Sequence, residues 1–166
     1  MVLLTPGESL VIGRVVLSHF EAGATDEMPW LESALAPEWT RADFEAATDS
    51  SEALLISDLV GTPMGLALVR IDTPTPGDAT IAFLAMQPGR RFRGLGGEAG
   101  LAVERLARER LGVQRVYAGV PEGRGLAVYF WLRLGFRPLS TAEAPRALLG
   151  LTGESKPGIW MLREPD

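Results

Sequence analysis

The sequence predicts an α+β protein in which a mixed, mostly antiparallel sheet is flanked by helices. Two observations carry this prediction. Three strand-like runs follow one another across short turns, at residues 53–60, 64–72 and 79–87. A helical apolar period then begins at residue 95, and the chain goes on as strand, helix and two short strands. With 166 residues, the chain is expected to form a single domain, 1–166.

The first 50 residues add one strand and two helices to this plan. A run rich in valine and leucine at 10–17 predicts the first strand, and short helices are expected at 28–35 and 41–48. Thr40 and Asp43 have the spacing of a capping box, which marks the start of the second helix. Residues 61–63 and 73–78 are rich in glycine, proline and threonine and predict the turns of a three-stranded meander.

The helix from residue 95 is expected to be amphipathic and to end at Gly112. Its other face carries two oppositely charged pairs at i,i+4 spacing, Glu104 with Arg108 and Arg105 with Glu109. A strand at 115–120, a helix at 125–134, a strand at 136–139, a helical turn at 146–149 and a last strand at 159–163 are expected to follow. The apolar stripe of the long helix consists of Leu95, Ala99, Ala102, Val103, Leu106 and Ala107.

The amino-acid composition excludes several kinds of functional site. The chain has no cysteine and one histidine, so disulfides, a thiolate nucleophile and sulfur-ligated metal sites are excluded, and no metal is expected. The N-terminus lacks the pattern of a signal peptide, and no run approaches the roughly 20 apolar residues of a membrane helix. A cytoplasmic protein with no membrane partner is therefore expected.

Charge is distributed unevenly along the chain, whose net charge is −5. Residues 20–52 contain nine acidic side chains and only Arg41, whereas residues 89–115 contain seven arginines and three glutamates. The two segments could present fields of opposite sign to different ligands, or could simply be solvated helix faces. Nucleic acid is not expected as a partner, because the basic stretch is short and partly paired in an acidic protein.

An arginine- and glycine-rich turn joins the third meander strand to the long helix. Such a strand-to-helix turn presents backbone N–H groups and the positive end of the helix dipole, and glycine lets an anion approach them closely. Arginine adds charge and donor geometry suited to phosphate. The sequence of the turn is Arg91-Phe92-Arg93-Gly94-Leu95-Gly96-Gly97.

Three kinds of phosphate-binding turn can be compared with this segment. A P-loop is excluded because no Lys-Ser or Lys-Thr follows the glycines. Gly94, Gly96 and Ala99 match the dinucleotide pattern G-x-G-x-x-A, but the acidic residue expected about 20 positions later is missing. The turn resembles the acyl-CoA loop of the GNAT superfamily of acyl-CoA N-acyltransferases, Q/R-x-x-G-x-G/A, with Arg91, Gly94 and Gly96 in the matching places.

Other positions agree with the resemblance. Pro88 stands three residues before Arg91, and a helix followed by Leu134-Gly135-Phe136 matches a second motif of the superfamily, so the likeness covers about residues 53–139. The resemblance implies a sheet with splayed central strands and acetyl-CoA as co-substrate. It implies that the following residues bind this co-substrate: Leu84, Ala85, Met86, Arg91, Phe92, Arg93, Gly94, Leu95, Gly96 and Gly97.

The catalytic residues of the superfamily are only partly matched. The tyrosine that usually protonates the departing thiolate is replaced by Trp131, whose indole is no practical proton source. Tyr129 stands two residues earlier, about 200° around the helix, and is a catalytic candidate or a packing residue. Arg124 occupies the place of a frequent asparagine and would reach a phosphate or ribose of the co-substrate, or cap its helix.

A general base is not assigned by the sequence. The strand at 79–87, where many relatives have one, contains no acidic residue. Four side chains with suitable chemistry could act directly or through water, or could be ordinary surface residues; they are His19, Asp58, Asp72 and Glu122. Trp30 and Trp39 could line a substrate pocket in the acidic region or could be core residues.

The function expected is transfer of an acetyl group from acetyl-CoA to a primary amine, on a small molecule or a peptide. The acidic segment at 20–52 favours a cationic acceptor. The alternatives are a CoA-binding module of the same fold with weak or no transferase activity and a dinucleotide-binding oxidoreductase. A homodimer is compatible with the sequence, which does not decide the oligomeric state.

Overall fold

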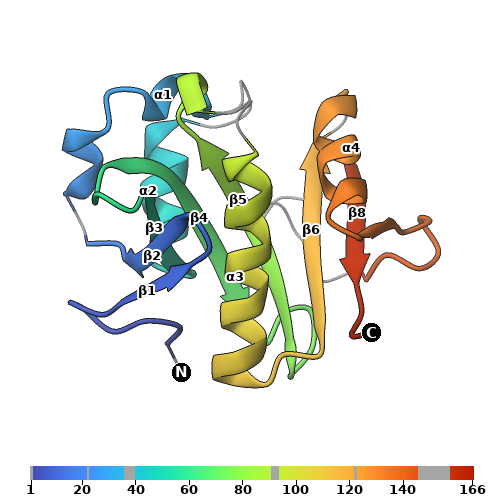
Figure 1. Cartoon of the computed structure of the whole chain (residues 1–166). Coiled ribbons are helices and arrows are strands. Elements are labelled where there is room, and N and C mark those ends of the chain that lie inside the picture. The colour runs from blue at the N-terminus through green and yellow to red at the C-terminus, as the bar shows by residue number, and fades with distance from the viewer. Residues whose placement is uncertain (1, 22, 36–39, 91–93, 122, 146–157) are drawn as a thin grey trace.

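The computed structural model describes residues 2–21, 23–35, 40–90, 94–121, 123–145 and 158–166 (Figure 1). Over these residues one eight-stranded sheet has the order β1-β2-β3-β4-β5-β6-β8-β7. All neighbours are antiparallel except β5 and β6, so the predicted mixed, mostly antiparallel α+β sheet is confirmed. The strands are β1 (Ser9–Ile12), β2 (Val15–His19), β3 (Glu52–Ser57), β4 (Pro63–Ile71), β5 (Asp78–Met86), β6 (Arg115–Pro121), β7 (Arg137–Pro138) and β8 (Gly158–Arg163).

Helices lie on both faces of this sheet. Figure 1 shows α3 lying along one face, with α2 on the other side of the strands. In the described parts of the chain, no helix is long and apolar enough to cross a membrane. The helical segments are η1 (Ala24–Glu27), α1 (Leu31–Ala34), α2 (Arg41–Thr48), η2 (Pro88–Arg90), α3 (Leu95–Leu111) and α4 (Gly125–Arg133).

The prediction of one strand over 10–17 is wrong, because the run folds back on itself. Ile12 pairs with Val15, so Gly13 and Arg14 form a two-residue hairpin loop between β1 and β2. Such a loop needs a positive φ, and Gly13 has φ 59°. Since the apolar pattern continues on both sides of the loop, the turn is hidden within a strand-like run.

The sequence predicted the bounds of α2 correctly, and it predicted the preceding helix only in part. The Thr40 hydroxyl accepts a hydrogen bond from the Asp43 N–H at 3.1 Å, and the Asp43 carboxylate accepts one from the Thr40 N–H at 2.9 Å. The helix expected at 28–35 is reduced to the four residues of α1, preceded by η1. The strand expected at 53–60 ends at Ser57, because Asp58 accepts hydrogen bonds from the N–H groups of Val60 and Thr62.

Two apolar clusters occupy the two faces of the sheet. The cluster under α3 contains the whole stripe expected on that helix together with inward-facing residues of six strands. The second cluster lies under α1 and α2 and includes Phe44, whose ring meets the Phe83 ring edge to face at 5.4 Å between centroids. The face that a strand residue points to can therefore be read from the cluster it joins.

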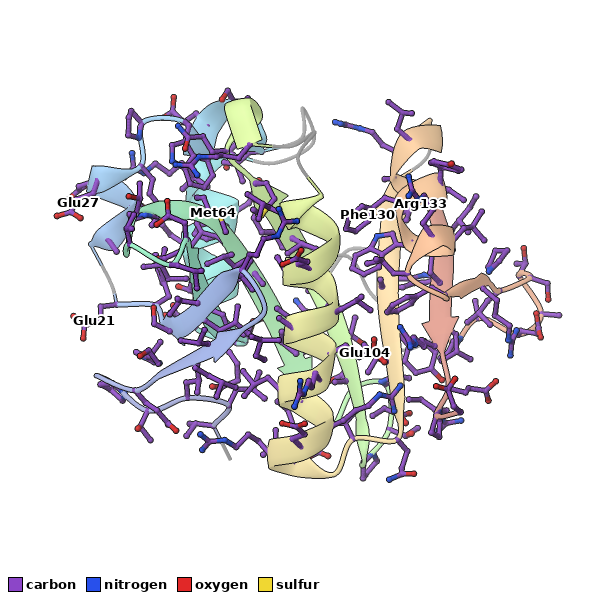
Figure 2. The ribbon with its side chains drawn as sticks, in the orientation of Figure 1. Glu21, Glu27, Met64, Glu104, Phe130 and Arg133 are labelled. Atoms are coloured by element: carbon purple, nitrogen blue, oxygen red, sulfur yellow. The ribbon has the colours of Figure 1, made fainter. Side chains whose placement is uncertain are left out.

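Glu104 lies on the face of α3 away from the expected apolar stripe, yet it is buried. Both expected pairs form, but Glu104 is only 5% exposed. Its carboxylate lies 2.9 Å from Arg108 Nε and 3.2 Å from Nη1 of Arg163, on β8 (Figure 2). Arg163 Nη1 also donates to the Leu134 carbonyl at 2.6 Å, so this network links α3 to β8 and to the end of α4.

Strands β5 and β6 are paired over only part of their length. Their parallel ladder begins with Asp78 opposite Arg115 and ends with Ile81 opposite Ala118. Strand β5 continues to Met86 alongside β4, whereas β6 continues to Pro121 alongside β8. The two strands diverge beyond the ladder, as Figure 1 shows, and this region is called the splay below.

A β-bulge lies where the splay begins. Leu68 pairs with Phe83 but Val69 pairs with Ile81, which leaves Ala82 as the extra residue on β5. The extra residue changes the alternation of faces: Ile81 points toward α3, and beyond the bulge Leu84 and Met86 do. The bulge therefore directs two apolar side chains of the splayed strand under the start of α3.

An ion pair fastens the closed end of the splay. Arg115 reaches Asp78 through two parallel contacts of 2.9 Å, one from Nε and one from Nη2, and Thr75 donates its hydroxyl to the same carboxylate at 2.6 Å. Asp78 is 2% exposed. The hydrogen bond to Asp78 raises the pKa of Arg115, which strengthens the preference of this guanidinium for its charged form.

We expect Arg115→Met to lower the free energy of unfolding by about 2 kcal/mol, because the buried Asp78 carboxylate would lose its charged partner. Urea denaturation of the wild-type and variant proteins measures the loss. Arg105→Met is the matched control, since Arg105 pairs with Glu109 on the exposed side of α3 and should cost less than about 1 kcal/mol. Equal effects of the two substitutions would contradict a special role for Arg115.

Candidate functional site

The three strand residues expected to bind the co-substrate lie on the splayed part of β5. Leu84, Ala85 and Met86 follow the end of the β5–β6 ladder and pair with β4 on their other side. Leu84 and Met86 pack in the cluster under α3. Their backbone is thus held on one side by β4, while the side toward β6 lies beyond the parallel ladder.

The turn after β5 leads into α3 without a side-chain cap. Arg91, Phe92 and Arg93 lie outside the described residues. The preceding Arg90 forms an ion pair with Asp58 at 3.4 Å. Gly94 is the N-cap of α3 and has φ 75°, a left-handed conformation that favours glycine, and it has no side chain to accept from the first N–H groups of the helix. Leu95, Gly96 and Gly97 supply these first N–H groups.

The glycines of this helix have a packing role that the sequence analysis did not identify. A Cβ atom on Gly96 would lie 3.6 Å from both Met86 and Phe130, and one on Gly97 would lie 3.5 Å from Leu134. A Cβ atom on Gly100 would lie 2.9 Å from Leu134. These missing side chains therefore face β5 and α4, and they let α4 approach α3 closely.

Arg14 is a basic residue near the start of α3 that the sequence analysis missed. It comes from the β1–β2 loop, and its Nη2 atom lies 3.5 Å from the position that a Cβ on Gly94 would take. Its guanidinium forms an ion pair with Glu98 at 2.6 Å, and the Arg14 N–H donates to the same carboxylate. These hydrogen bonds hold the pKa of Glu98 below its usual range. Arg14 thus offsets the acidic charge in the first turn of α3.

Helix α4 directs phenylalanine rather than tyrosine toward α3. Phe130 lies on the side of α4 that faces α3 (Figure 2). Tyr129 is 59% exposed, and the Arg133 guanidinium lies over its ring, 5.8 Å from the centroid. Tyr129 is therefore not a half-buried packing residue. Trp131 is buried and meets the rings of Phe130 and Phe136 edge to face. Arg124 is the exposed N-cap residue of α4.

The candidate bases do not lie together, and Asp58 stands at the splayed end of β5, where it pairs with Arg90. Asp58 caps the β3–β4 turn, and hydrogen bonds from Thr62 and Val60 together with Arg90 keep its pKa below the ordinary value, which makes it a weaker base. Asp72 lies in the β4–β5 turn and accepts from Gly77 at 2.9 Å, at the end of β5 opposite to Met86. Glu122 lies outside the described residues.

His19 is also distant from the splay. Its Nδ1 atom lies 3.2 Å from the Leu4 carbonyl oxygen. It stands on β2, which β3 and β4 separate from β5, a distance of roughly 14 Å at the usual strand spacing. The described residues contain no group of three His, Cys, Asp or Glu side chains that could hold a metal ion.

Two glutamates of the acidic N-terminal region lie at the edge of the molecule. Figure 2 places Glu21 and Glu27 at the outer edge, on the opposite side of α3 from Phe130. Arg41 forms ion pairs with two other acidic side chains of this region, those of Asp26 and Glu45. Trp30 is half-buried against the cluster under α1 and α2, and Trp39 lies outside the described residues.

Comparison with known proteins supports the interpretation of this geometry. Residues 20–136 match the Acetyltransferase (GNAT) family. A search of curated proteins found no significant match. Solved structures with the same fold include a GNAT family acetyltransferase from Elizabethkingia anophelis with acetyl-CoA bound, which is 16% identical with a TM-score of 0.68, over 92% of this chain and 99% of that chain.

Two further solved structures have amine acceptors in their names. The ribosomal-protein-S18-alanine N-acetyltransferase from Escherichia coli is 17% identical, with a TM-score of 0.64 over 90% of this chain and 93% of that chain. A chimera of the spermidine N-acetyltransferase from Vibrio cholerae is 14% identical, with a TM-score of 0.69 over 92% of this chain and 96% of that chain. At these identities the structures establish the shared fold.

The fold and the splayed strands thus define an acetyltransferase-type sheet, with a short parallel ladder at its centre and a glycine-rich helix start beside it. Since the family match covers well over half of its length, the chain belongs to the GNAT acetyltransferase family. The resemblance seen in the sequence is confirmed.

We expect Gly94→Ala and Gly96→Ala to have opposite effects on stability. Gly94→Ala should lower the free energy of unfolding by about 1 kcal/mol, because alanine is strained at the left-handed φ of residue 94. Gly96→Ala should raise it by up to about 1 kcal/mol, because residue 96 is helical and a Cβ there meets its neighbours at ordinary contact distance. Urea denaturation measures both values. A large loss of stability in Gly96→Ala would show that α3 and α4 tolerate no added atom.

Proposed function

We propose that this protein transfers an acetyl group from acetyl-CoA to a primary amine, directly and without a covalent enzyme intermediate. The observation that carries the proposal is the splay: β5 leaves β6 after Ile81, next to a helix start that has no side-chain cap. Membership of the GNAT acetyltransferase family supports the reaction class. The absence of cysteine fits direct transfer, since no thiol nucleophile of the chain is needed.

The first turn of α3 fits the charge of a pyrophosphate group. Its leading N–H groups belong to Leu95, Gly96 and Gly97, and the positive end of the helix dipole lies there. Arg14 stands beside Gly94, and the sequence adds Arg91 and Arg93 immediately before it, with Phe92 between them. Arg124, at the start of α4, would add charge from the other side of the splay.

The strand residues fit the remaining part of the co-substrate. In this proposal the backbone of Leu84, Ala85 and Met86 binds the pantetheine arm through hydrogen bonds, and acetyl-CoA supplies an activated acetyl group when it is bound. In the overall reaction a C–N bond forms, the C–S bond breaks, and a proton lost by the amine balances the one gained by the thiolate. The products are an amide and a free thiol, with no oxidant or reductant involved.

The proton for the departing thiolate is proposed to come from water. Phe130 and Trp131 cannot supply a proton, and Tyr129 is exposed under Arg133 on a different side of α4 from Phe130. No side chain on the α3 side of α4 can donate a proton to the thiolate. This also supports a second candidate function, a CoA-binding protein of this fold with weak or no transferase activity. The two functions share the co-substrate site and differ in turnover.

The acceptor is proposed to be an amine of a small molecule or a peptide, and a cationic acceptor remains the favoured class. Two proteins of this fold are named for amine acceptors, an alanine of ribosomal protein S18 and spermidine. From the outer edge of the molecule, Glu21 and Glu27 would act on a cation at long range, by raising its local concentration.

Incubation of the protein with acetyl-CoA and a panel of amines, with free thiol as the readout, tests this function. We expect turnover above the rate of acetyl-CoA hydrolysis for at least one amine, and thermal stabilisation by CoA but not by NAD. Stabilisation by CoA without turnover on any amine would favour the binding protein. Stabilisation by NAD instead would overturn both.

We expect Tyr129→Phe to change kcat by less than about twofold, because a proton donor that is required for the chemical step contributes on the order of 100-fold or more. Steady-state kinetics with the best amine of the panel measures the effect. Tyr117→Phe is a useful comparison, because burial raises the pKa of the Tyr117 hydroxyl and its side chain lies on the opposite sheet face from α3. A loss of more than tenfold confined to Tyr129→Phe would assign the donor role to Tyr129.

A further inference from the structure

The two faces of the sheet differ at the point where the splay begins. On one face, Leu84 and Met86 of β5 lie under α3, and Phe130 and Leu134 of α4 pack against the α3 glycines. That face is thus filled by apolar contacts between α3, α4 and β5. With the co-substrate proposed to lie between the starts of α3 and α4, we expect the acceptor to approach the splay from the other face.

Two small residues mark the start of the splay on that other face. The parallel ladder ends with Ile81 opposite Ala118, so the next residues in register are Ala82 and Gly119. Ala82 packs with the cluster under α1 and α2, and Gly119 alternates with Ala118 and Val120, which face α3. Alanine and glycine are thus the side chains at the point where the ladder opens, on the side away from α3, and neither is large enough to cover it.

Two aromatic side chains flank these small residues. Phe83 follows Ala82 on β5, is half-buried, and is held by the Phe44 ring. Trp160 of β8 pairs with Gly119, and three carbons of its six-membered ring lie 2.7 to 3.3 Å from the place where a Cβ on Gly119 would be. The indole of Trp160 therefore extends over β6 toward β5, and only glycine at 119 permits this.

The surroundings of Trp160 place it on the face away from α3. It packs with Tyr117, Leu139 and Leu162, whereas its neighbour Met161 belongs to the cluster under α3. Trp160 is half-buried, so part of the indole remains accessible. Among common side chains, tryptophan has the aromatic face that attracts an ammonium group most strongly.

We propose that Trp160 binds the ammonium group of the acceptor, which enters the splay between Phe83 and Trp160 on the face opposite α3. The inference rests on the proposed acetyltransferase function and adds a specificity-determining residue to it. The acceptor class is an amine that is cationic in solution, and Trp160 selects it at close range.

Kinetics of Trp160→Leu with acetyl-CoA and the best amine of the panel test this assignment. We expect the acceptor KM to rise by about 2- to 30-fold, the range that a cation–π contact covers, with the KM for acetyl-CoA changed by less than about twofold. Trp160→Phe should lie between the wild-type protein and Trp160→Leu. Ile159→Ala is the matched control, since Ile159 is the neighbouring exposed residue of β8, points to the α3 face, and should leave both KM values unchanged.

Inhibition by two isosteres isolates the role of charge. The N,N,N-trimethyl derivative of the best amine should inhibit the wild-type protein more strongly than its neutral tert-butyl counterpart, and Trp160→Leu should abolish the difference. Gly119→Ala should act in the same direction, because its Cβ would displace the indole while leaving tryptophan in the sequence. It also provides the comparison if Trp160→Leu does not fold.

The outcomes separate this inference from the function on which it rests. If the wild-type protein acetylates no amine, both proposals fail. If it does, but the acceptor KM and the preference for the charged isostere survive in Trp160→Leu, or in Gly119→Ala should the former not fold, the role of Trp160 is refuted and the acetyltransferase function stands.

Discussion

The four-residue parallel ladder between β5 and β6 is the constraint on which the rest of the structure depends. Asp78 and Arg115 fasten its closed end with a bidentate ion pair, while Glu104 of α3 bonds Arg163 of β8. Both contacts pair a buried carboxylate with a guanidinium group. A shift of β5 against β6, or of α3 against β8, would therefore leave a buried carboxylate without its partner. With its closed end held in this way, the sheet can leave the other end of the two strands unpaired.

Ending the ladder between two central strands lowers the stability of the sheet unless the side chains there pack elsewhere. The bulge at Ala82 allows such packing. By changing the alternation of faces, it turns Leu84 and Met86 toward α3. The small residues of α3 then allow Phe130 and Leu134 to pack close by. Apolar burial on this face thus compensates for the part of the β5–β6 ladder that does not form.

The elements with local signals were the ones that the sequence predicted well. The capping box fixed the start of α2, and the apolar period fixed α3 almost to the residue. The features that the sequence did not predict depend on residues far away in the chain. Glu104 is buried because Arg163, 59 positions later, completes its pairing, and Arg14 reaches the start of α3 only after the β1–β2 hairpin has formed. Neither contact can be predicted from the spacing of neighbouring residues.

The second motif shows the difference between recognising a fold and recognising its chemistry. Gly135 has φ 89° and lets the chain leave α4 sharply, so that Phe136 meets the buried Trp131 at 4.8 Å between ring centroids. The motif thus closes α4 onto the sheet by packing, which an indole achieves as well as a phenol does. The Leu134-Gly135-Phe136 motif therefore indicates that α4 packs against the sheet as in the family. It gives no information about proton transfer. The residues that select and activate the acceptor must be sought where the two strands part, among side chains that no short motif brings together.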